Sequence, residues 1–150
     1  MPKIVALDFG LKRIGVAITD DLNIIASGLD TVMTHEIIPF LKDLTNKFEI
    51  RTFVIGKPVQ KDNTPSEIEY DILKFIKILH KTFPDINIDR YDERFTSVIA
   101  HKTIISSGIK KSKRNNKFLV DKISATVILQ SYLENLDKWY YQLLLLDIQS

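Results

Sequence analysis

One stretch near the start of the chain decides its fold: VALDFGLKRIGVAITD, residues 5–20. Apolar residues run almost unbroken on both sides of GLKR, residues 10–13, and this pattern predicts two strands joined by a tight turn. Asp8 departs from the pattern, because a carboxylate inside an apolar strand must be desolvated or give up its charge. We therefore expect another group to compensate Asp8.

The neighbours of Asp8 follow from strand alternation. Ile4, Ala6 and Asp8 share one face of the first strand, and Gly15 and Ala17 form the small face of the second. If this small face lies beside Asp8, a cation and a ligand have room to approach the carboxylate. The alternative is that Asp8 merely ends its strand and caps the turn that follows.

The chain has the length and composition of one globular domain. Its 150 residues are 45% hydrophobic and 27% charged, which argues against a disordered chain, and the absence of cysteine excludes disulfides and thiolate metal sites. We predict a single domain over residues 1–150, with a core from about 3 to 136 and a C-terminal extension over 137–150. The strand signal begins by Ile4, and no apolar run approaches the ~20 residues of a membrane span. We therefore expect no signal peptide, no membrane partner and a cytoplasmic location.

The apolar periodicity of the remaining chain predicts further strands and helices. A third strand over 24–29 follows the first two by a short connection, which makes the three antiparallel. The later elements, in chain order, are a helix (34–48), a strand (51–56), a helix capped at Thr64 (64–83), a strand (86–91) and two helices (95–106 and 118–136). Helical crossovers make the later strands parallel. This order describes an α/β, ribonuclease H-like fold: a mixed five-stranded sheet, three antiparallel strands and then parallel ones, with helices on both faces.

Two further acids stand where this fold could bring them to Asp8. Glu93 follows the fifth strand, and Asp121 lies near the start of the last helix. Ordinary roles remain open, because Glu93 could pair with Arg90 or Arg94, and Asp121 could interact with the positive end of its helix. Three converging carboxylates would need a cation to stay ionised. Oxygen ligands, without cysteine or suitably spaced histidine, favour Mg²⁺ or Mn²⁺.

Four stretches, spread in order along the chain, resemble one protein family. They are ALDFGLKRIGVA (6–17), VIGKP (54–58), DERFTS (92–97) and DKISATVILQSYL (121–133). They resemble the YqgF/RuvX family of pre-16S rRNA nucleases, also described as Holliday junction resolvase-like proteins. The sequence departs from the family pattern at Lys57, Asn63, Ser97 and Ser124, and none of these departures removes a predicted ligand.

The resemblance implies a ribonuclease H-like nuclease, a hydrolase of phosphodiester bonds. Its catalytic and metal-binding acids would be Asp8, Glu93 and Asp121, with Mg²⁺ or Mn²⁺ as cofactor. It further implies processing of the 5′ end of pre-16S rRNA during ribosome biogenesis. The implied partners are nucleic acid, as structured RNA or branched DNA, and ribosomal precursor particles.

Basic residues near these acids are candidates for nucleic-acid binding. Five of them crowd into residues 110–117 without an acid, directly before Asp121, which favours phosphate contact over a merely solvated loop. Arg94 and Thr96 could in addition orient Glu93. The predicted nucleic-acid-binding residues are Lys12, Arg13, Arg94, Thr96, Lys110, Lys111, Lys113, Arg114 and Lys117.

Other functions remain open from the sequence. A Holliday junction or branched-DNA resolvase would use the same acids, whereas a non-catalytic RNA-binding module of ribosome assembly would not need them. The hairpin at Asp8 also resembles the phosphate-binding hairpin of the actin, chaperone and sugar-kinase class, but those proteins need two such domains around the nucleotide. The residues from Trp139 to Ile148 lie beyond the family core and predict a packing or dimer element. The chain is expected to be a monomer or a homodimer.

Overall fold

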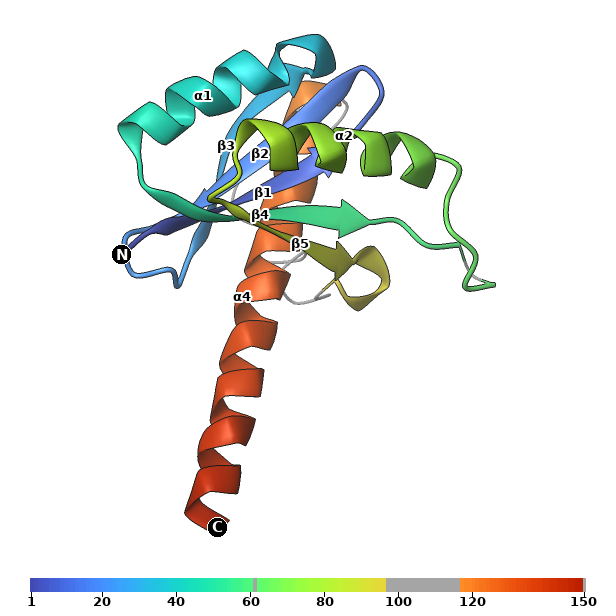
Figure 1. Ribbon diagram of the computed structural model, residues 1–150. Helices are drawn as coiled ribbons and strands as arrows, with labels where there is room; N and C mark the ends of the chain where they lie inside the picture. Colours follow the sequence, from blue (N-terminus) through green and yellow to red (C-terminus); the bar gives the residue numbers. More distant parts are fainter. Residues whose placement is uncertain (61, 97–116, 150) are drawn as a thin grey trace.

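A mixed five-stranded sheet forms the centre of the molecule (Figure 1). The structure is a computed structural model and describes residues 1–60, 62–96 and 117–149. The strands lie in the order β3-β2-β1-β4-β5, with β1 pairing antiparallel to β2 and parallel to β4. Their bounds are Lys3–Phe9 for β1, Arg13–Thr19 for β2, Ala26–Met33 for β3, Ile50–Lys57 for β4 and Asn87–Asp92 for β5. The predicted sheet, with three antiparallel strands followed by parallel ones, is confirmed.

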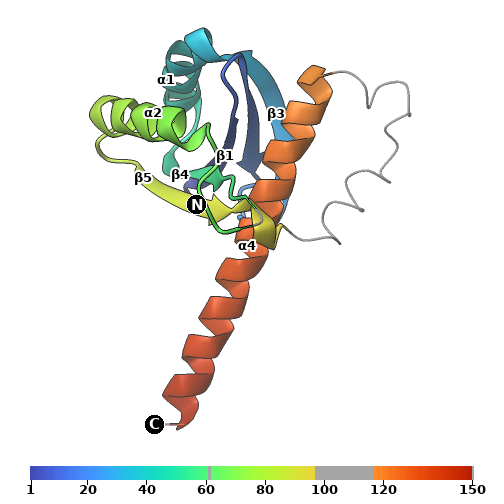
Figure 2. The ribbon, with the colours of Figure 1, turned by 90° about the vertical axis from the view of Figure 1, so that its right-hand side faces the viewer.

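Helices cover both faces of the sheet. Figure 2 shows α1 (Ile37–Lys47) and α2 (Glu69–Thr82) on one face and α4 (Lys117–Gln149) on the other. Short 3₁₀ turns η1 (Thr34–Glu36) and η2 (Glu93–Phe95) precede α1 and follow β5. The core is correspondingly double, because alternate residues of β1 point to opposite faces. Val5 and Leu7 pack with the first helix pair, and Ile4 and Ala6 pack with α4.

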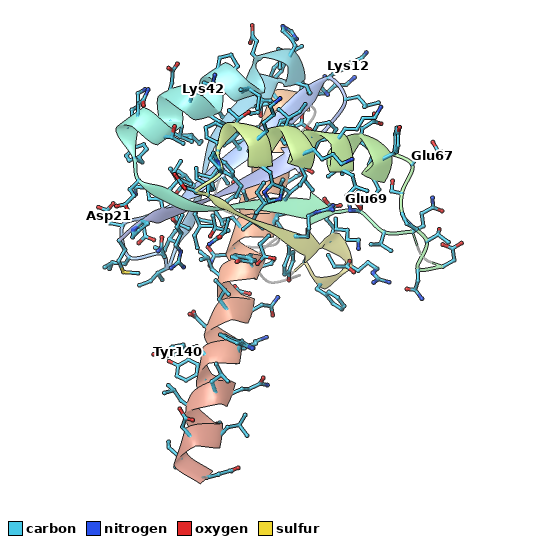
Figure 3. All side chains as sticks on the ribbon, in the orientation of Figure 1. Lys12, Asp21, Lys42, Glu67, Glu69 and Tyr140 are labelled. Atoms are coloured by element: carbon cyan, nitrogen blue, oxygen red, sulfur yellow. The ribbon has the colours of Figure 1, made fainter. Side chains whose placement is uncertain are left out.

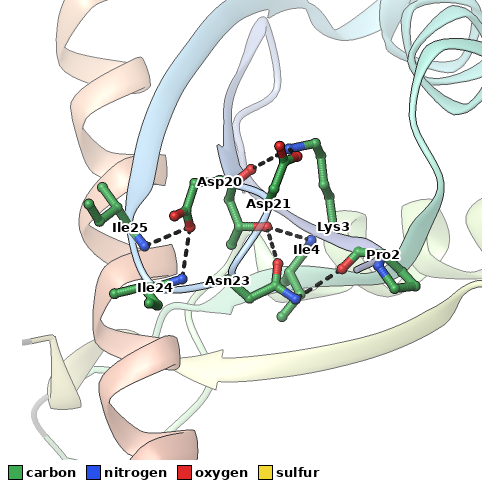
Figure 4. A network of polar contacts seen from close by, with 9 residues as sticks. Pro2, Lys3, Ile4, Asp20, Asp21, Asn23, Ile24 and Ile25 are labelled. Carbon is green, nitrogen blue, oxygen red and sulfur yellow. Dashed lines mark hydrogen bonds and ion pairs between the residues drawn. The ribbon is translucent and has the colours of Figure 1, made fainter.

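The third strand begins two residues later and ends four residues later than predicted. The Asp20 carboxylate accepts hydrogen bonds from the backbone N–H groups of Ile24 (2.8 Å) and Ile25 (2.9 Å), as Figure 4 shows. These bonds fold residues 20–25 into a turn and take both isoleucines out of the strand. The apolar pair that suggested a strand start therefore lies exposed in the turn.

The predicted helix start at Thr64 was wrong. Asp62 accepts from both the Thr64 hydroxyl (2.6 Å) and the Thr64 backbone N–H (3.1 Å), so a local turn uses the capping groups. Pro65 then forms an isolated bridge with Val59. Helix α2 begins only at Glu69, five residues after the predicted cap.

The last helix is longer than predicted. It begins at Lys117, as expected within one residue, but passes the predicted end at 136 and continues to Gln149. Figure 1 shows its C-terminal part running well beyond the sheet. No described helix combines the length and the apolar character needed to cross a bilayer. The helix predicted over 95–106 and the basic residues Lys110, Lys111, Lys113 and Arg114 lie outside the described residues, apart from the η2 turn that ends at Phe95.

Candidate functional site

The three predicted acids come from three separate elements that meet beside the end of β1. Asp8 is on β1, Glu93 opens the η2 turn directly after β5, and Asp121 is the fifth residue of α4. Asp8 and Glu93 line one cavity of about 270 Å³. Its other lining residues are Thr96, Ser124, Val127 and Ile128, so one wall of the cavity is α4. The fold therefore brings Asp8 and Glu93 to a common, largely polar hollow.

Asp8 shows the clearest pKa shift among the acids of this site. The pKa of Asp8 is raised from 3.8 to about 7. Burial is the largest cause, and the negative charges of Glu93 and then Asp121 add to it. Burial also raises the pKa of Glu93, against the opposing charge of Arg90. A carboxyl that keeps its proton near neutral pH marks a place where an arriving cation would be stabilised.

Two glycines flank Asp8 and make room for the elements that carry the other acids. Gly15 is the register partner of Asp8 on β2, and a Cβ there would overlap the carbonyl oxygen of Asp121 and lie 2.5 Å from its carbonyl carbon. Gly56 lies on β4, where a Cβ would lie 2.5 Å from Oε1 of Glu93. The small face beside Asp8 exists as predicted. At Gly15, however, the backbone of α4 occupies the room that we expected a ligand to use.

Asp121 is held by a predicted phosphate-binding residue. The Arg13 Nε donates to Oδ2 of Asp121 over 2.9 Å, and both side chains are about a quarter exposed. The Arg13 guanidinium also lies 5.6 Å from the ring centroid of Phe118. Lys12, the neighbouring candidate, lies exposed in the turn between β1 and β2 (Figure 3). One basic residue of this turn is therefore engaged at the acid site, and the other faces solvent.

Local hydrogen bonds fix the backbone that carries Glu93. Thr96 donates its hydroxyl to the carbonyl oxygen of Glu93 (2.6 Å), and Asp92 accepts from the backbone N–H of Arg94 (2.9 Å). The Arg94 guanidinium pairs with the Asp92 carboxylate at 2.6 Å and also contacts Asn63. Arg94 is thus bound to the loop before α2, while Thr96 both supports Glu93 and lines the cavity.

The arginines suggested as alternative partners of Glu93 pair elsewhere. Arg94 pairs with Asp92, as above, and Arg90 pairs with Oε1 of Glu69 at 2.7 Å. Arg90 also donates to the carbonyl oxygen of Gly56 (3.1 Å), the residue against which Glu93 lies. The half-buried Arg90–Glu69 pair therefore braces the end of β4 beneath the site.

Sequence reasoning missed a second brace, formed by Tyr91. Its hydroxyl donates to the carbonyl oxygen of Phe95 (2.6 Å) and accepts from the side-chain amide of Asn135 (2.6 Å). These bonds connect the η2 turn to α4, so the segment that carries Glu93 is held from both ends. An aromatic residue in a strand is ordinary core, and the only signal in the sequence was its place two residues before the acid.

The described residues hold no group of three or more histidine, cysteine or acidic side chains arranged to bind one metal ion. In this structure the Asp121 carboxylate is paired with Arg13. Asp8 and Glu93 remain the acids that face the shared cavity. Of the predicted basic segment, the structure describes Lys117, which is exposed at the start of α4.

Comparison with known proteins gives one family. The RuvX family model, described as Holliday junction resolvase, matches residues 2–135. A protein of Bacteroides fragilis named "Putative pre-16S rRNA nuclease" is 48% identical over 134 residues, which are 89% of this chain and 97% of that protein. One of Christiangramia forsetii with the same name is 50% identical over 133 residues, which are 89% of this chain and 98% of that protein.

Comparison with solved structures gives the fold. The Thermus thermophilus RuvC in complex with Holliday junction substrate matches with a TM-score of 0.53 at 12% identity, over 87% of this chain and 92% of that chain. The Fowlpox virus resolvase in its complex with substrate Holliday junction DNA matches with a TM-score of 0.54 at 18% identity, over 89% of this chain and 98% of that chain. At such identities the likeness concerns the fold alone, and the predicted ribonuclease H-like fold is confirmed.

Proposed function

The chain belongs to the RuvX family, and from this premise we propose that it is a metal-dependent nuclease that hydrolyses phosphodiester bonds in nucleic acid. The observation that carries the proposal is the cavity that Asp8 and Glu93 line together, from elements distant in sequence and beside the helix that carries Asp121. Carboxylates gathered in this way are costly to a fold unless they serve a ligand. Asp8, Glu93 and Asp121 are accordingly the proposed catalytic acids.

The donor set suits a hard divalent cation. Asp8, Glu93 and Asp121 offer only carboxylate oxygens, the preferred ligands of Mg²⁺ and Mn²⁺. Burial, and then the charges of Glu93 and Asp121, raise the pKa of Asp8, and such an ion would offset both effects. Asp8 and Glu93 would hold the ion from the cavity, and Asp121 would join them once Arg13 leaves its carboxylate. The chemistry that a divalent ion supplies there is activation of water and neutralisation of charge on the scissile phosphate.

The pairing of Arg13 with Asp121 lets the substrate act on the acid site. A guanidinium binds phosphate in the same two-pronged way as it binds a carboxylate, so an incoming phosphodiester competes with Asp121 for Arg13. Lys12 lies next to Arg13 in the exposed turn, and Lys117 begins the helix that carries Asp121. Substrate binding and release of the Asp121 carboxylate are thereby coupled through one side chain.

The proposed substrate is precursor 16S rRNA, cut at its 5′ end during ribosome biogenesis. Its support is the name shared by relatives that are 48–50% identical over nearly their whole length. A second candidate substrate is branched DNA, which the description of the RuvX family model favours. The same acids would serve either substrate.

The decisive experiment compares cleavage by the wild-type chain and Asp8→Asn, with Mg²⁺ or Mn²⁺ and with EDTA. Precursor 16S rRNA, single strands, duplexes and four-way DNA junctions serve as substrates. Asp43→Asn is the matched control, because Asp43 is an exposed carboxylate on α1, across the sheet from the cavity. We expect cation-dependent cleavage of precursor rRNA by wild type and Asp43→Asn, and loss of at least ~10²-fold in Asp8→Asn with an unchanged circular dichroism spectrum.

Equal cleavage by Asp8→Asn and wild type would remove the acid site from the mechanism. Absence of cleavage by wild type on every substrate would leave a non-catalytic binding module. Cleavage confined to the junction would select the second candidate substrate. Activity that survives in EDTA would contradict the metal dependence while leaving the nuclease in place.

The predicted nucleic-acid contacts have a separate test. Replacing the five basic residues of 110–117 by glutamine should weaken RNA binding and flatten its log–log salt dependence by nearly one unit for each phosphate that these residues neutralise. The matched control replaces five lysines of α1 and α2 by glutamine, at positions 42, 47, 74, 77 and 81. An unchanged salt slope in the first variant, or an equal change in both, would show that the segment does not bind phosphates specifically.

A further inference from the structure

The C-terminal end of α4 is an apolar helix that no described part of the chain covers. We call residues 137–149 the tail. It lies beyond the family match, which ends at residue 135, and beyond the last buried residue of the helix, Leu133. The relatives from Bacteroides and Christiangramia are already matched over 97% and 98% of their length by 134 and 133 residues, so the tail is an addition to the shared domain.

The tail exposes a large apolar surface to solvent. Its large apolar side chains are between two-fifths and four-fifths exposed, and Figure 3 shows Tyr140 pointing into open space. They are Trp139, Tyr140, Tyr141, Leu143, Leu144, Leu145, Leu146 and Ile148. Together they offer roughly 800 Å² for burial, which is about what each partner contributes to a standard protein interface. Monomeric proteins rarely leave a patch of that size open.

A hollow at the base of the tail offers a place for such a surface to bind. Its volume is about 480 Å³, and it opens between the tail, the N-terminus and the turn before β3. Its apolar lining is Met1, Leu22, Leu133, Leu136, Trp139 and Tyr140. Because the tail is apolar on nearly all sides, one helix beside it would cover it only in part. A second wall, such as this hollow, is needed to cover the rest.

We infer that the tails of two copies of this chain pair antiparallel, each inserting its C-terminal end into the hollow at the base of the other. The 13 residues of the tail span about 19 Å, so the tip of one tail reaches the base of its partner when the two overlap fully. The arrangement is two-fold symmetric and closed, as most homodimers are.

The hollow favours the antiparallel direction, because only antiparallel tails bring the tip of one copy to the base of the other. A two-fold axis between residues 142 and 143 sets the tip of each tail beside the base of the other. Parallel tails would instead bring the two tips together and leave both hollows without an occupant. A lipid surface is disfavoured, because the tail has one basic residue and two acids, whereas helices that bind membranes carry basic residues on the polar face.

The paired tails would leave the acid site free. Residue 142 lies about 30 Å along α4 from Asp121, and the tail leaves the sheet at the end opposite the acids. The inference therefore does not depend on the proposed nuclease activity, and its test needs no substrate.

Sedimentation of the full chain tests the association. We expect a mass near twice 17.3 kDa at micromolar concentration for wild type, and a shift to 17.3 kDa for Tyr141→Glu/Leu145→Glu. Ile78→Glu is the control, because Ile78 is 51% exposed on α2 and lies outside the tail and the hollow. A wild-type monomer at high micromolar concentration would overturn the inference. So would a monomer that binds phosphatidylcholine or phosphatidylglycerol vesicles, which would assign the tail to a lipid surface.

The direction of pairing has its own test, because the chain has no cysteine. Gln142→Cys places a thiol beside the two-fold axis, so oxidation should give a disulfide-linked dimer. Gln149→Cys places thiols roughly 20 Å apart in antiparallel tails but side by side in parallel ones. Cross-linking of Gln149→Cys as efficient as that of Gln142→Cys would overturn the antiparallel arrangement.

Discussion

Removing the acid at position 8 should make the protein more stable, by an amount that depends on pH. Burial and the charges of Glu93 and Asp121 raise the pKa of Asp8 from 3.8 to about 7. The folded chain therefore holds this proton more tightly than the unfolded chain does. In such a case the stability contributed by the group is fully present below the unfolded pKa and is lost as pH rises through the folded pKa. Wild-type stability should accordingly fall between about pH 4 and pH 7 on account of this one group.

The magnitude follows from the shift of about three pKa units at about 1.4 kcal/mol each, which gives roughly 4 kcal/mol above pH 7 and about 1.5 kcal/mol at pH 5. Asparagine has nearly the same shape and no charge, so Asp8→Asn escapes this cost. The difference in free energy of unfolding between Asp8→Asn and wild type should therefore grow by about 2–3 kcal/mol from pH 5 to pH 8. Comparing the two pH values cancels the effects of replacing a carboxyl by an amide.

The assay is urea unfolding in EDTA at both pH values, with Asp43→Asn as the control, for which we expect no such growth. Adding Mg²⁺ or Mn²⁺ should reduce the difference in free energy of unfolding between Asp8→Asn and wild type at pH 8, because a cation held by the acids stabilises wild type more than Asp8→Asn. If this difference in free energy of unfolding is the same at pH 5 and pH 8, the raised pKa of Asp8 is refuted, because Asp8 would then not be held in a desolvated, negative site. A less stable Asp8→Asn at pH 8 would refute it as well.

Three further predictions rest on the contacts around the acids. In Gly56→Ala the new Cβ would lie 2.5 Å from Oε1 of Glu93, so cleavage should fall by about 10²-fold while urea unfolding changes little; wild-type rates would contradict this. In Gly15→Ala the backbone of Asp121 must move, so urea unfolding should report a loss of about 1–3 kcal/mol, and unchanged stability would be the contrary result. Arg13→Gln removes the cation paired with Asp121, so calorimetry without nucleic acid should find tighter Mn²⁺ binding than in wild type; weaker or equal binding would count against the exchange at Arg13.

The sheet could be predicted because its signals are local. Apolar alternation assigns Ile4 and Ala6 to one face and Val5 and Leu7 to the other, and the two cores divide in the same way. The same alternation put Asp8 on the face that α4 covers. What the pattern could not give was the depth to which α4 approaches, since only the packed structure sets its backbone against Gly15.

Errors at the element ends come from side chains that compete for backbone groups. Asp62 takes the Thr64 groups that would have capped a helix, and Asp20 takes the amides that would have begun β3. The end of α4 was misplaced for a different reason. Residues 137–149 contain no glycine or proline, and their apolar residues surround the helix, so neither a stop signal nor a helical period stands out.

The pairing of Arg13 with Asp121 shows a further limit of sequence reasoning. The two residues are 108 positions apart, and each had a plausible role of its own, phosphate contact for one and metal ligation for the other. Because a guanidinium and a carboxylate attract each other, Arg13 and Asp121 pair with each other in this structure. A sequence identifies the charges of a site, but only contacts in the fold tell which charges are already paired.

Helix α4 explains how the chain carries a tail without disturbing the acid site. Its contacts with the sheet lie at Gly15 and Gly28 and along Ala125 to Leu136, so they end one residue past the family match. The tail begins only after these contacts have fixed the helix, so exposed residues there can change without moving Asp121. Because a helix is straight and stiff over this length, the same contacts also fix the direction in which the tail leaves the domain. The sheet therefore orients both an acid at one end of α4 and an apolar surface at the other, and the two can evolve separately.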